Sequence, residues 1–402
     1  MNIVLLYENI LDVPYANAFK KVISSVYEDS KDIKSISFQH ISQFDPHAEN
    51  VYVFPVDLQW QDITTIFKSL NKKTLDKLSK YKIPIVFYLP TEGFSFKNEQ
   101  FKHFMKILYD QRIEFNLFEC PTFFITGNYK LQYKETLGID KTFYISYFEK
   151  KLYKKLLDSH YDDVLIGELK KPKYDFLSYN GQIRPNRLAL FTKLNRKKLS
   201  GNGLISFLFA EQEELQHDEK NLTDLLYPDD LKYFNIAKWH WQPKYLDVSV
   251  SGYLDNAYCI NNNHFLNSYF SLISETEYES DTCFPTEKIY KSIKALHPFL
   301  IWGSPGILDL LRKQGYETFP ELFDESYDNE INHKKRLAMI VDQVEMFCSL
   351  PYKLKQRKRR SVADKLLHNR NTFNDNAQNF NENLKYIFLE IGKRINDKKC
   401  KT

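Results

Sequence analysis

Lys288 stands in the first turn of a predicted helix, where an acidic residue is ordinarily favoured. The stretch TEKIYKSIKAL makes Thr286 the N-cap and puts Glu287 and Lys288 in the first turn. Because a helix N-terminus carries roughly half a positive charge, a cation there is unfavourable without an anion nearby. One interpretation is a phosphate bound by backbone N–H groups and Lys288, with Glu287 accepting from ribose hydroxyls. The other is an ordinary capped helix whose Lys288 faces water.

A second predicted helix starts with the same charge pattern. In the stretch GQIRPNRLAL, Pro185 suits the first helical position, and Arg184 and Arg187 lie on either side of it. An anion shared between the two helix starts would satisfy both sets of cations, and a diphosphate is long enough to be shared. Exposure of Arg187 to solvent is the alternative.

Two loops that follow apolar runs are further candidates for ligand contact. GSPG follows PFLIW, so Gly303 permits close approach of a ligand to the backbone, whereas a tight turn alone accounts for Gly306. Glu92 follows IPIVFYL, where a carboxylate can act as general base toward an attacking hydroxyl. A capping or solvated side chain is the other interpretation of Glu92.

The composition is that of a large globular protein. Hydrophobic residues make up 43% and charged residues 27% of 402 residues, which predicts a folded chain of about two domains. The net charge of +4 is too small to indicate specific nucleic-acid binding. The five cysteines are scattered and no metal-binding motif is found, so we expect no disulfide framework, no metal and no cofactor.

Short apolar runs alternate with helix-period segments along most of the chain. This pattern predicts an α/β fold with two Rossmann-like, doubly wound domains, an interdomain cleft and a helical C-terminal tail. In the second domain this alternation ends with a predicted strand, PFLIWG, a predicted helix, ILDLLRKQG, and another predicted strand, YETF. The segment around 210–255 shows only loops and short helices. The predicted boundaries are 1–168 for an acceptor domain, 169–350 for a donor domain and 351–402 for the tail.

The run SYFSLISETEYESDTCFPTEKIYKSIKALHPFLIWGSPG resembles the donor-binding motif of the α1,3-fucosyltransferases and related bacterial and viral GT-B glycosyltransferases. The likeness covers residues 174–345 and includes the block LSYNGQIRPNRLAL. It implies a GT-B fold and a nucleoside-diphosphate sugar bound by the C-terminal domain. By this resemblance, Glu287 would bind the ribose and Glu275 would lie near the donor. Lys288 and Arg184 would bind the diphosphate.

The resemblance also implies an inverting, metal-independent transfer with a glutamate of the N-terminal domain as base, and Glu92 matches that position best. We therefore expect a glycosyltransferase that uses a nucleotide sugar and a glycan or lipid-linked acceptor. The alternatives are a non-catalytic protein that binds nucleotide sugars or polyanions, and a GT-B-like epimerase. The sugar is left open.

Basic residues are concentrated in the segment 353–370, which we expect to be helical. A solvated helix is one interpretation. The other is attraction to an anionic membrane, mainly electrostatic. No run approaches the roughly 18 apolar residues of a membrane span, and the start lacks the features of a signal peptide. We therefore expect a cytoplasmic protein, with peripheral contact to the inner face of a membrane as the additional hypothesis.

Overall fold

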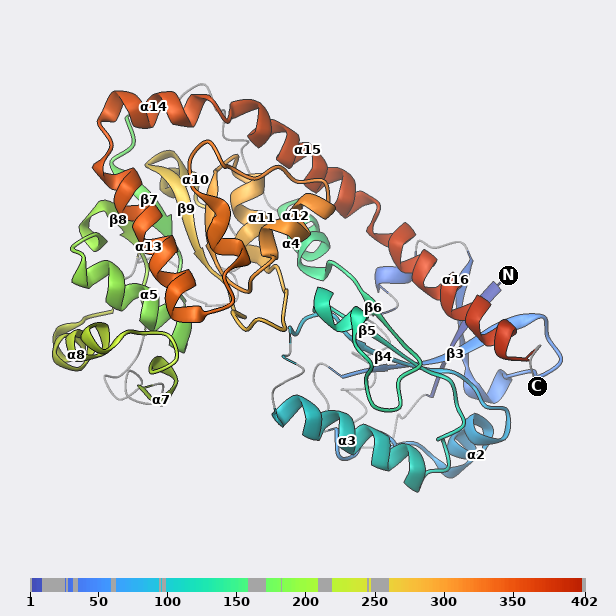
Figure 1. Cartoon of the computed structure of the whole chain (residues 1–402). Helices are drawn as coiled ribbons and strands as arrows, with labels where there is room; N and C mark the ends of the chain where they lie inside the picture. The colour runs from blue at the N-terminus through green and yellow to red at the C-terminus, as the bar shows by residue number, and fades with distance from the viewer. Residues whose placement is uncertain are drawn as a thin grey trace. The chain divides into compact units, whose positions relative to one another are not determined.

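The computed structural model of this chain describes residues 2–8, 26, 28–31, 35–58, 63–93, 95, 99–157, 171–181, 183–208, 219–243, 246 and 260–399. Internal contacts divide the chain into two compact units. Unit 1 comprises Met1–Tyr147 and Gln378–Thr402, and unit 2 comprises Phe148–Ala377. Each unit contains a parallel sheet with helices, and the C-terminal region is helical (Figure 1). The predicted α/β fold class is confirmed.

Unit 1 is built on a six-stranded parallel sheet with the strand order β2-β1-β3-β4-β5-β6. Its strands are β1 (Asn2–Tyr7), β2 (Ile36–His40), β3 (Asn50–Asp57), β4 (Ile85–Leu89), β5 (Thr122–Thr126) and β6 (Lys141–Tyr144). The chain places β2 on one side of β1 and all later strands on the other side. This reversal is typical of doubly wound sheets.

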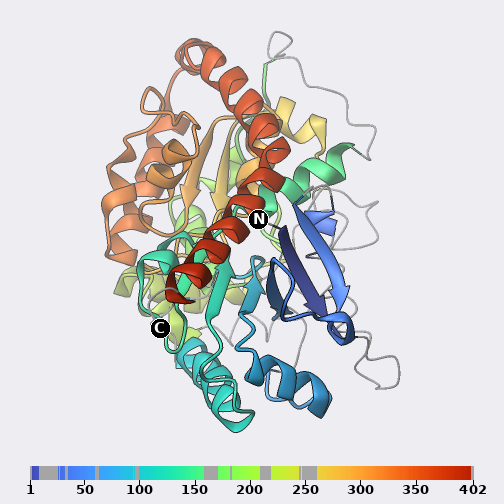
Figure 2. The same cartoon turned by 90° about the vertical axis from the view of Figure 1, so that its right-hand side faces the viewer.

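Helices cover both faces of the unit 1 sheet. They are α2 (Lys72–Lys80), α3 (Glu99–Glu114) and α16 (Phe380–Lys399). Side chains alternate between the faces along a strand, so Val4 and Leu6 join the core beneath α2 and α3, whereas Ile3 and Leu5 pack with α16. Figure 1 shows the strands between α16 and the helices α2 and α3, and Figure 2 gives the view from the side. Burial on both faces explains the nearly continuous apolar runs of β4 and β5.

Unit 2 contains a four-stranded parallel sheet with the order β10-β9-β7-β8. Its strands are β7 (Tyr174–Ser178), β8 (Gly203–Ile205), β9 (Ser268–Ser274) and β10 (Phe299–Trp302). From β7 the chain first adds β8 on one side and then adds β9 on the other. The carboxyl ends of β7 and β9 therefore form the topological switch point of this sheet, which is where open α/β sheets bind ligands.

The remaining helices belong to unit 2 or to its borders. They are α4 (Tyr147–Leu157), α5 (Pro185–Arg196), α7 (Glu219–Leu222), α8 (Pro228–Ala237), α10 (Asn262–Leu266), α11 (Glu287–Lys294), α12 (Ile307–Lys313), α13 (His333–Ser349), α14 (Tyr352–Arg360) and α15 (Ala363–Gln378). Short 3-10 turns occur at η1 (Ile41–Gln43), η2 (Tyr129–Tyr133), η4 (Ser200–Asn202), η5 (Lys238–His240) and η6 (Glu325–Asn329). None of the described helices is both long and apolar enough to cross a bilayer.

The C-terminal helices do not form one separate tail. Contacts assign α14 and nearly all of α15 to unit 2, and α16 to unit 1. The boundary predicted at residue 350, between the donor domain and the tail, lies between α13 and α14. Both of these helices belong to unit 2. The run ANAFKKVISSVYE at 16–28, whose spacing of apolar residues predicts a helix, and the segment 210–255 both lie partly outside the described residues.

Candidate donor site of unit 2

The loops that follow β7 and β9 are joined directly at the switch point of unit 2. Asn186, in the first turn of α5, donates from Nδ2 to the carbonyl of Glu275 at 2.7 Å. Glu275 follows β9 and contacts Thr286, the residue immediately before α11, through its carboxylate. The starts of helices α5 and α11 are therefore connected through two residues, and one ligand can contact both.

Glu275 lies at the centre of this arrangement and is completely buried. Its Oε1 accepts the backbone N–H of Thr286 at 3.0 Å, and its Oε2 accepts the Thr286 hydroxyl. Thr286 is the N-cap of α11, as predicted, and its hydroxyl oxygen accepts from the backbone N–H of Lys288. A carboxylate of the protein thus already occupies the N-terminus of α11.

Lys288 is compensated within the protein. Its Nζ lies 3.0 Å from Oε1 of Glu287 and 3.8 Å from Oε2 of Glu275, and it donates to the Thr286 hydroxyl at 3.0 Å. The side chains of Lys288 and Glu287 are each 16% exposed, so both reach the surface of the site. Lys288 alone therefore does not require a bound anion, although its ammonium remains accessible to one.

The pKa values of the two carboxylates in this cluster, Glu275 and Glu287, are shifted in opposite directions. Burial raises the pKa of Glu275 above its usual range, in spite of the Lys288 ammonium nearby. Burial also acts to raise the pKa of Glu287, but the charge and hydrogen bond of Lys288 outweigh it and lower that pKa. Glu287 is thus an ionised hydrogen-bond acceptor at neutral pH, the form that binds hydroxyl groups.

The start of α5 lacks such compensation. Arg184 is the N-cap residue, Pro185 follows it, and the first turn contains no acidic residue. Within the described part of the chain, the Arg184 side chain makes no hydrogen bond and no ion pair, and it is partly exposed. Arg187, by contrast, is buried, so the solvent-exposed interpretation of this residue is wrong. A positive helix end and a cation therefore coincide here.

Two buried amide oxygens lie beside the switch point. Oδ1 of Asn180, just after β7, and Oδ1 of Asn186 find no hydrogen-bond donor among the described residues. The residues are 4% and 0% exposed, respectively. Buried acceptors are nearly always satisfied, and because protein atoms cover both oxygens, an enclosed water is the donor that can reach them.

Neighbouring helices contribute further cations that the sequence did not single out. Lys291, one turn after Lys288, is buried with its ammonium 4.8 Å from the ring centroid of Tyr179. Lys151 of α4 is close enough to Glu287 for the two charges to interact, while burial lowers the Lys151 pKa. Lys291 could have been found as the next position on the inward side of α11. Lys151 could not, because it is distant in the sequence.

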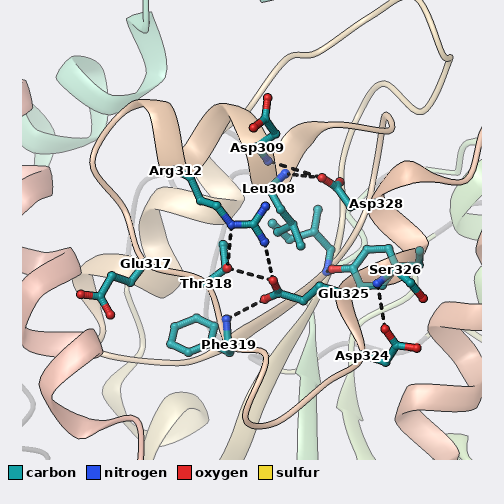
Figure 3. A network of polar contacts seen from close by, with 12 residues as sticks. Leu308, Asp309, Arg312, Glu317, Thr318, Phe319, Asp324, Glu325, Ser326 and Asp328 are labelled. Atoms are coloured by element: carbon teal, nitrogen blue, oxygen red, sulfur yellow. Dashed lines mark hydrogen bonds and ion pairs between the residues drawn. The ribbon is translucent and has the colours of Figure 1, made fainter.

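The GSPG turn has a structural role. Gly303 packs against Glu275, since a Cβ there would lie 3.3 Å from Cβ of Glu275. Gly306 has a φ of +82°, and its N–H donates to the Asp328 carbonyl at 2.8 Å. Figure 3 shows Asp328 also accepting from the backbone N–H groups of Leu308 and Asp309, at 3.1 and 3.4 Å. The N-terminus of α12 is therefore occupied by Asp328.

The polar network of Figure 3 continues around Glu325. Its carboxylate accepts from the Thr318 hydroxyl at 2.9 Å, the Phe319 N–H at 2.7 Å and the Arg312 guanidinium. These contacts connect α12 to the following loop. Together with Asp328, they stabilise the turn whose Gly303 packs against Glu275.

Glu92 lies in unit 1, three residues beyond the end of β4, and its side chain is exposed. The predicted position after a buried strand is therefore confirmed, and its role as base stays a prediction. Within the described ranges, no three His, Cys, Asp or Glu side chains gather in a way that could hold a metal ion.

The basic segment 353–370 is helical, as predicted, but its cations have different environments. Lys355 is buried against Asp175, with Nζ 2.6 Å from Oδ1, and Arg359 is buried with Nη2 2.6 Å from the Leu296 carbonyl. Lys365 pairs with Glu321 at 2.7 Å. Much of this positive charge therefore attaches the C-terminal helices to unit 2.

Solved structures with similar architecture are found at low sequence identity. A UDP-forming α,α-trehalose-phosphate synthase from Burkholderia vietnamiensis is 11% identical, with a TM-score of 0.39 over 86% of this chain and 76% of that chain. Its counterpart from Burkholderia xenovorans is 11% identical, with a TM-score of 0.38 and coverages of 92% and 80%. An α1,3-fucosyltransferase is 12% identical, with a TM-score of 0.30 and 90% of each chain covered. No family model and no curated protein matches the sequence.

Proposed function

We propose that unit 2 binds a nucleoside-diphosphate sugar at its switch point and that the protein is a glycosyltransferase of the GT-B type. The observation that carries this proposal is the start of α5, where Arg184 has no partner among the described residues at a helix end without an acidic residue. Backbone N–H groups and an arginine at a helix start are a favourable site for a phosphate. The Asn186–Glu275 hydrogen bond brings the start of α11 next to it.

The diphosphate and the ribose of the donor each have a chemically matched group in this site. The diphosphate binds to the guanidinium of Arg184 and to the accessible ammonium of Lys288. The ribose hydroxyls donate to the ionised Glu287. Positive groups aimed at the diphosphate stabilise the charge that develops as it departs.

Transfer requires a base that deprotonates the acceptor hydroxyl. We assign this role to Glu92 of unit 1, an exposed carboxylate beyond the carboxyl end of β4. The proposed reaction forms a bond between the acceptor oxygen and the anomeric carbon, breaks the bond to the diphosphate and inverts that carbon, without a metal. A glycan or a lipid-linked sugar is the proposed acceptor.

Titration calorimetry with UDP, GDP and CDP tests the donor site. We expect at least one of them to bind, and Arg184→Ala and Lys288→Ala each to weaken its binding by about tenfold or more, since charge-assisted hydrogen bonds contribute roughly 1.5–3 kcal/mol. Lys73→Ala is the matched control, because Lys73 is an exposed cation in the first turn of α2. Unchanged affinity in both site variants would exclude this binding mode.

Acceptor-dependent release of nucleoside diphosphate separates transfer from simple binding. In the presence of a chelator, transfer should persist, and Glu92→Gln should reduce it by about two to four orders of magnitude without changing donor affinity. Donor binding without any release in the presence of a broad acceptor mixture would favour a non-catalytic binding protein.

A peripheral membrane contact is proposed for the exposed side of α14. Lys353, Arg357 and Arg360 are exposed there and share one side of the helix, next to the exposed Tyr352. Three such charges predict weak, salt-sensitive attraction to anionic lipid. Co-sedimentation with neutral and anionic vesicles at low salt measures it, and equal binding to both would exclude the contact.

A further inference from the structure

A second hollow in unit 2 is not used by the proposed donor site. It is a pocket of about 450 Å³, a size typical of sites for small organic ligands. Its lining comes from three places: the end of α7 with the loop after it, the loop after β9, and the first residues of α13. The lining residues used below include Asn221, Asp224, Tyr278, Glu279, Ile331 and His333.

A buried arginine holds the wall of this pocket in place. Arg336 is 1% exposed and donates to the carbonyls of Tyr278 at 2.6 Å and Glu330 at 2.7 Å. Its guanidinium carbon lies 5.0 Å from the ring centroid of Trp302. The Tyr278 ring stacks on the same tryptophan, with centroids 6.0 Å apart. The loop after β9 and the start of α13 are thus fixed to each other before any ligand arrives.

The same arginine determines the hydrogen bonding of His333. Nη2 of Arg336 lies 3.1 Å from Nδ1 of His333, and because a guanidinium only donates, Nδ1 is the acceptor. Nε2 therefore carries a proton and points to Oε2 of Glu279, 3.3 Å away. One carboxylate oxygen of Glu279 is oriented by the imidazole, and the side chain remains 42% exposed.

The lining contains both charges, the carboxylates of Asp224 and Glu279 and the ammonium of Lys334, and together with its uncharged groups it favours a neutral, polyhydroxylated ligand. Asp224 and Glu279 accept hydrogen bonds from hydroxyls, and the amide of Asn221 both donates and accepts. The side chain of Ile331 is 67% exposed at this pocket and offers an apolar surface. Sugars present hydroxyl groups around their edge and apolar C–H groups on their faces. We propose that this pocket is a binding site for a neutral saccharide.

Two other ligand classes fit the pocket less well. A phosphate group would meet one cation, Lys334, and two carboxylates, Asp224 and Glu279, so it is less favoured here than at the start of α5, where no acidic residue is present. A flat nucleobase needs an open aromatic face, but the Tyr278 ring already stacks on Trp302 and meets the His333 ring edge to face, with centroids 5.3 Å apart. The inference does not rest on the proposed function, since a saccharide can bind here whether or not the protein transfers sugars.

Saturation-transfer NMR and calorimetry on the full chain test the proposal with a defined panel. The panel contains the methyl glycosides of glucose, galactose, mannose and N-acetylglucosamine, together with maltose, lactose, cellobiose and chitobiose. We expect at least one of them to bind at millimolar concentration. Glu279→Gln and Asp224→Asn should each weaken that binding by about fivefold or more, because each removes a charged acceptor.

The controls separate this site from the donor site. Lys288→Ala, and saturation with UDP or GDP, should leave saccharide binding unchanged, and Glu279→Gln should leave nucleoside-diphosphate affinity unchanged. The proposal is overturned if no panel member binds, if both acidic variants bind as the wild type does, or if UDP or GDP displaces the saccharide. Binding of uridine or guanosine that depends on Glu279 would equally overturn it, because the pocket would then hold a nucleoside.

Discussion

The carboxylate of Glu275 accepts the backbone N–H of Thr286 at 3.0 Å, and this contact joins the end of strand β9 to the start of helix α11. The two residues are 11 positions apart in the sequence, yet the hydrogen bond closes the loop between them into a fixed turn. Lys288 then lies between two carboxylates. The positive charge at the start of α11 is therefore part of an internal cluster that a ligand can join.

Removing the Glu275 carboxylate should destabilise unit 2. Glu275→Ala leaves the buried Thr286 N–H and hydroxyl without their acceptor, and we expect a loss of about 2–3 kcal/mol in the free energy of unfolding. Urea titration of the unit 2 transition measures it. Glu345→Ala is the control, since that glutamate is 50% exposed and pairs with Lys197 at the surface. Equal effects of the two substitutions would contradict a central role for Glu275.

Asp230→Ala should be among the most damaging substitutions in unit 2. Lys193 is buried against Asp230, with Nζ 2.8 Å from Oδ2, and removing one partner of a buried pair costs roughly 3–5 kcal/mol. Asp229→Ala is the matched control, because the neighbouring Asp229 is 81% exposed and lies 3.4 Å from Arg196. Urea unfolding should show that the control substitution lowers the free energy of unfolding by less than about 1 kcal/mol.

Acid should weaken unit 2 through His297. Burial, with a smaller contribution from the Arg359 charge, lowers the pKa of His297 to about 3. In the unfolded chain the imidazole of His297 is protonated below about pH 6.5, whereas in the folded protein it stays neutral at that pH. The free energy of unfolding therefore falls as the pH drops below about 6.5.

The expected loss between pH 7.5 and pH 5.5 is about 1.4 kcal/mol from this residue. His297→Gln should remove that part of the pH dependence, because glutamine does not titrate, and urea unfolding at both pH values measures it. An identical pH dependence in the variant and the wild type would show that another group is responsible.

Gly306→Ala tests whether the GSPG turn is structural. A Cβ at Gly306 meets no atom within 4 Å, so the cost is the strain of a left-handed backbone, about 1–2 kcal/mol for an ordinary residue. Gly306→Asn should cost less, since asparagine tolerates this conformation better. Thermal unfolding measures both, and donor affinity should stay unchanged. A loss of donor binding without a loss of stability would contradict this assignment.

The central strands of both sheets and the buried edge strand β10 of unit 2 could be predicted from the sequence, whereas the edge strands of unit 1 could not. Strands such as β4 and β9 are buried on both faces and appear as apolar runs. Strand β2 buries only its first residue, Ile36, so its sequence ISFQH carries little apolar signal. Strand β6 has four residues. An edge strand with one neighbour needs few buried side chains, which removes the pattern on which prediction depends.

The run YETF illustrates a different error. Tyr316 and Phe319 are buried, as the apolar pattern indicates, but these residues form no strand in the described chain. The Tyr316 hydroxyl donates to Glu149 and the Phe319 N–H donates to Glu325. Burial in an irregular loop gives the same sequence signal as a short strand.

The candidate site was predictable where it depends on local sequence and not where it depends on pairing across the fold. The N-cap role of Thr286 and the first-turn position of Lys288 follow from neighbouring residues alone. The compensation of Lys288 by Glu275 depends on how a loop closes, and the unpaired oxygens of Asn180 and Asn186 depend on burial in three dimensions. Neither has a signature in the sequence.

Unit 1 is assembled from segments on either side of unit 2, and this sets the order in which the two units can be completed during synthesis. Strand β1 is translated before unit 2, but Leu384 and Phe388 of α16, which pack in the same core as its Ile3 and Leu5, are translated after it. Unit 2 is one uninterrupted segment and can finish folding earlier. The face of β1 that α16 covers therefore waits for its partner until unit 2 has been made.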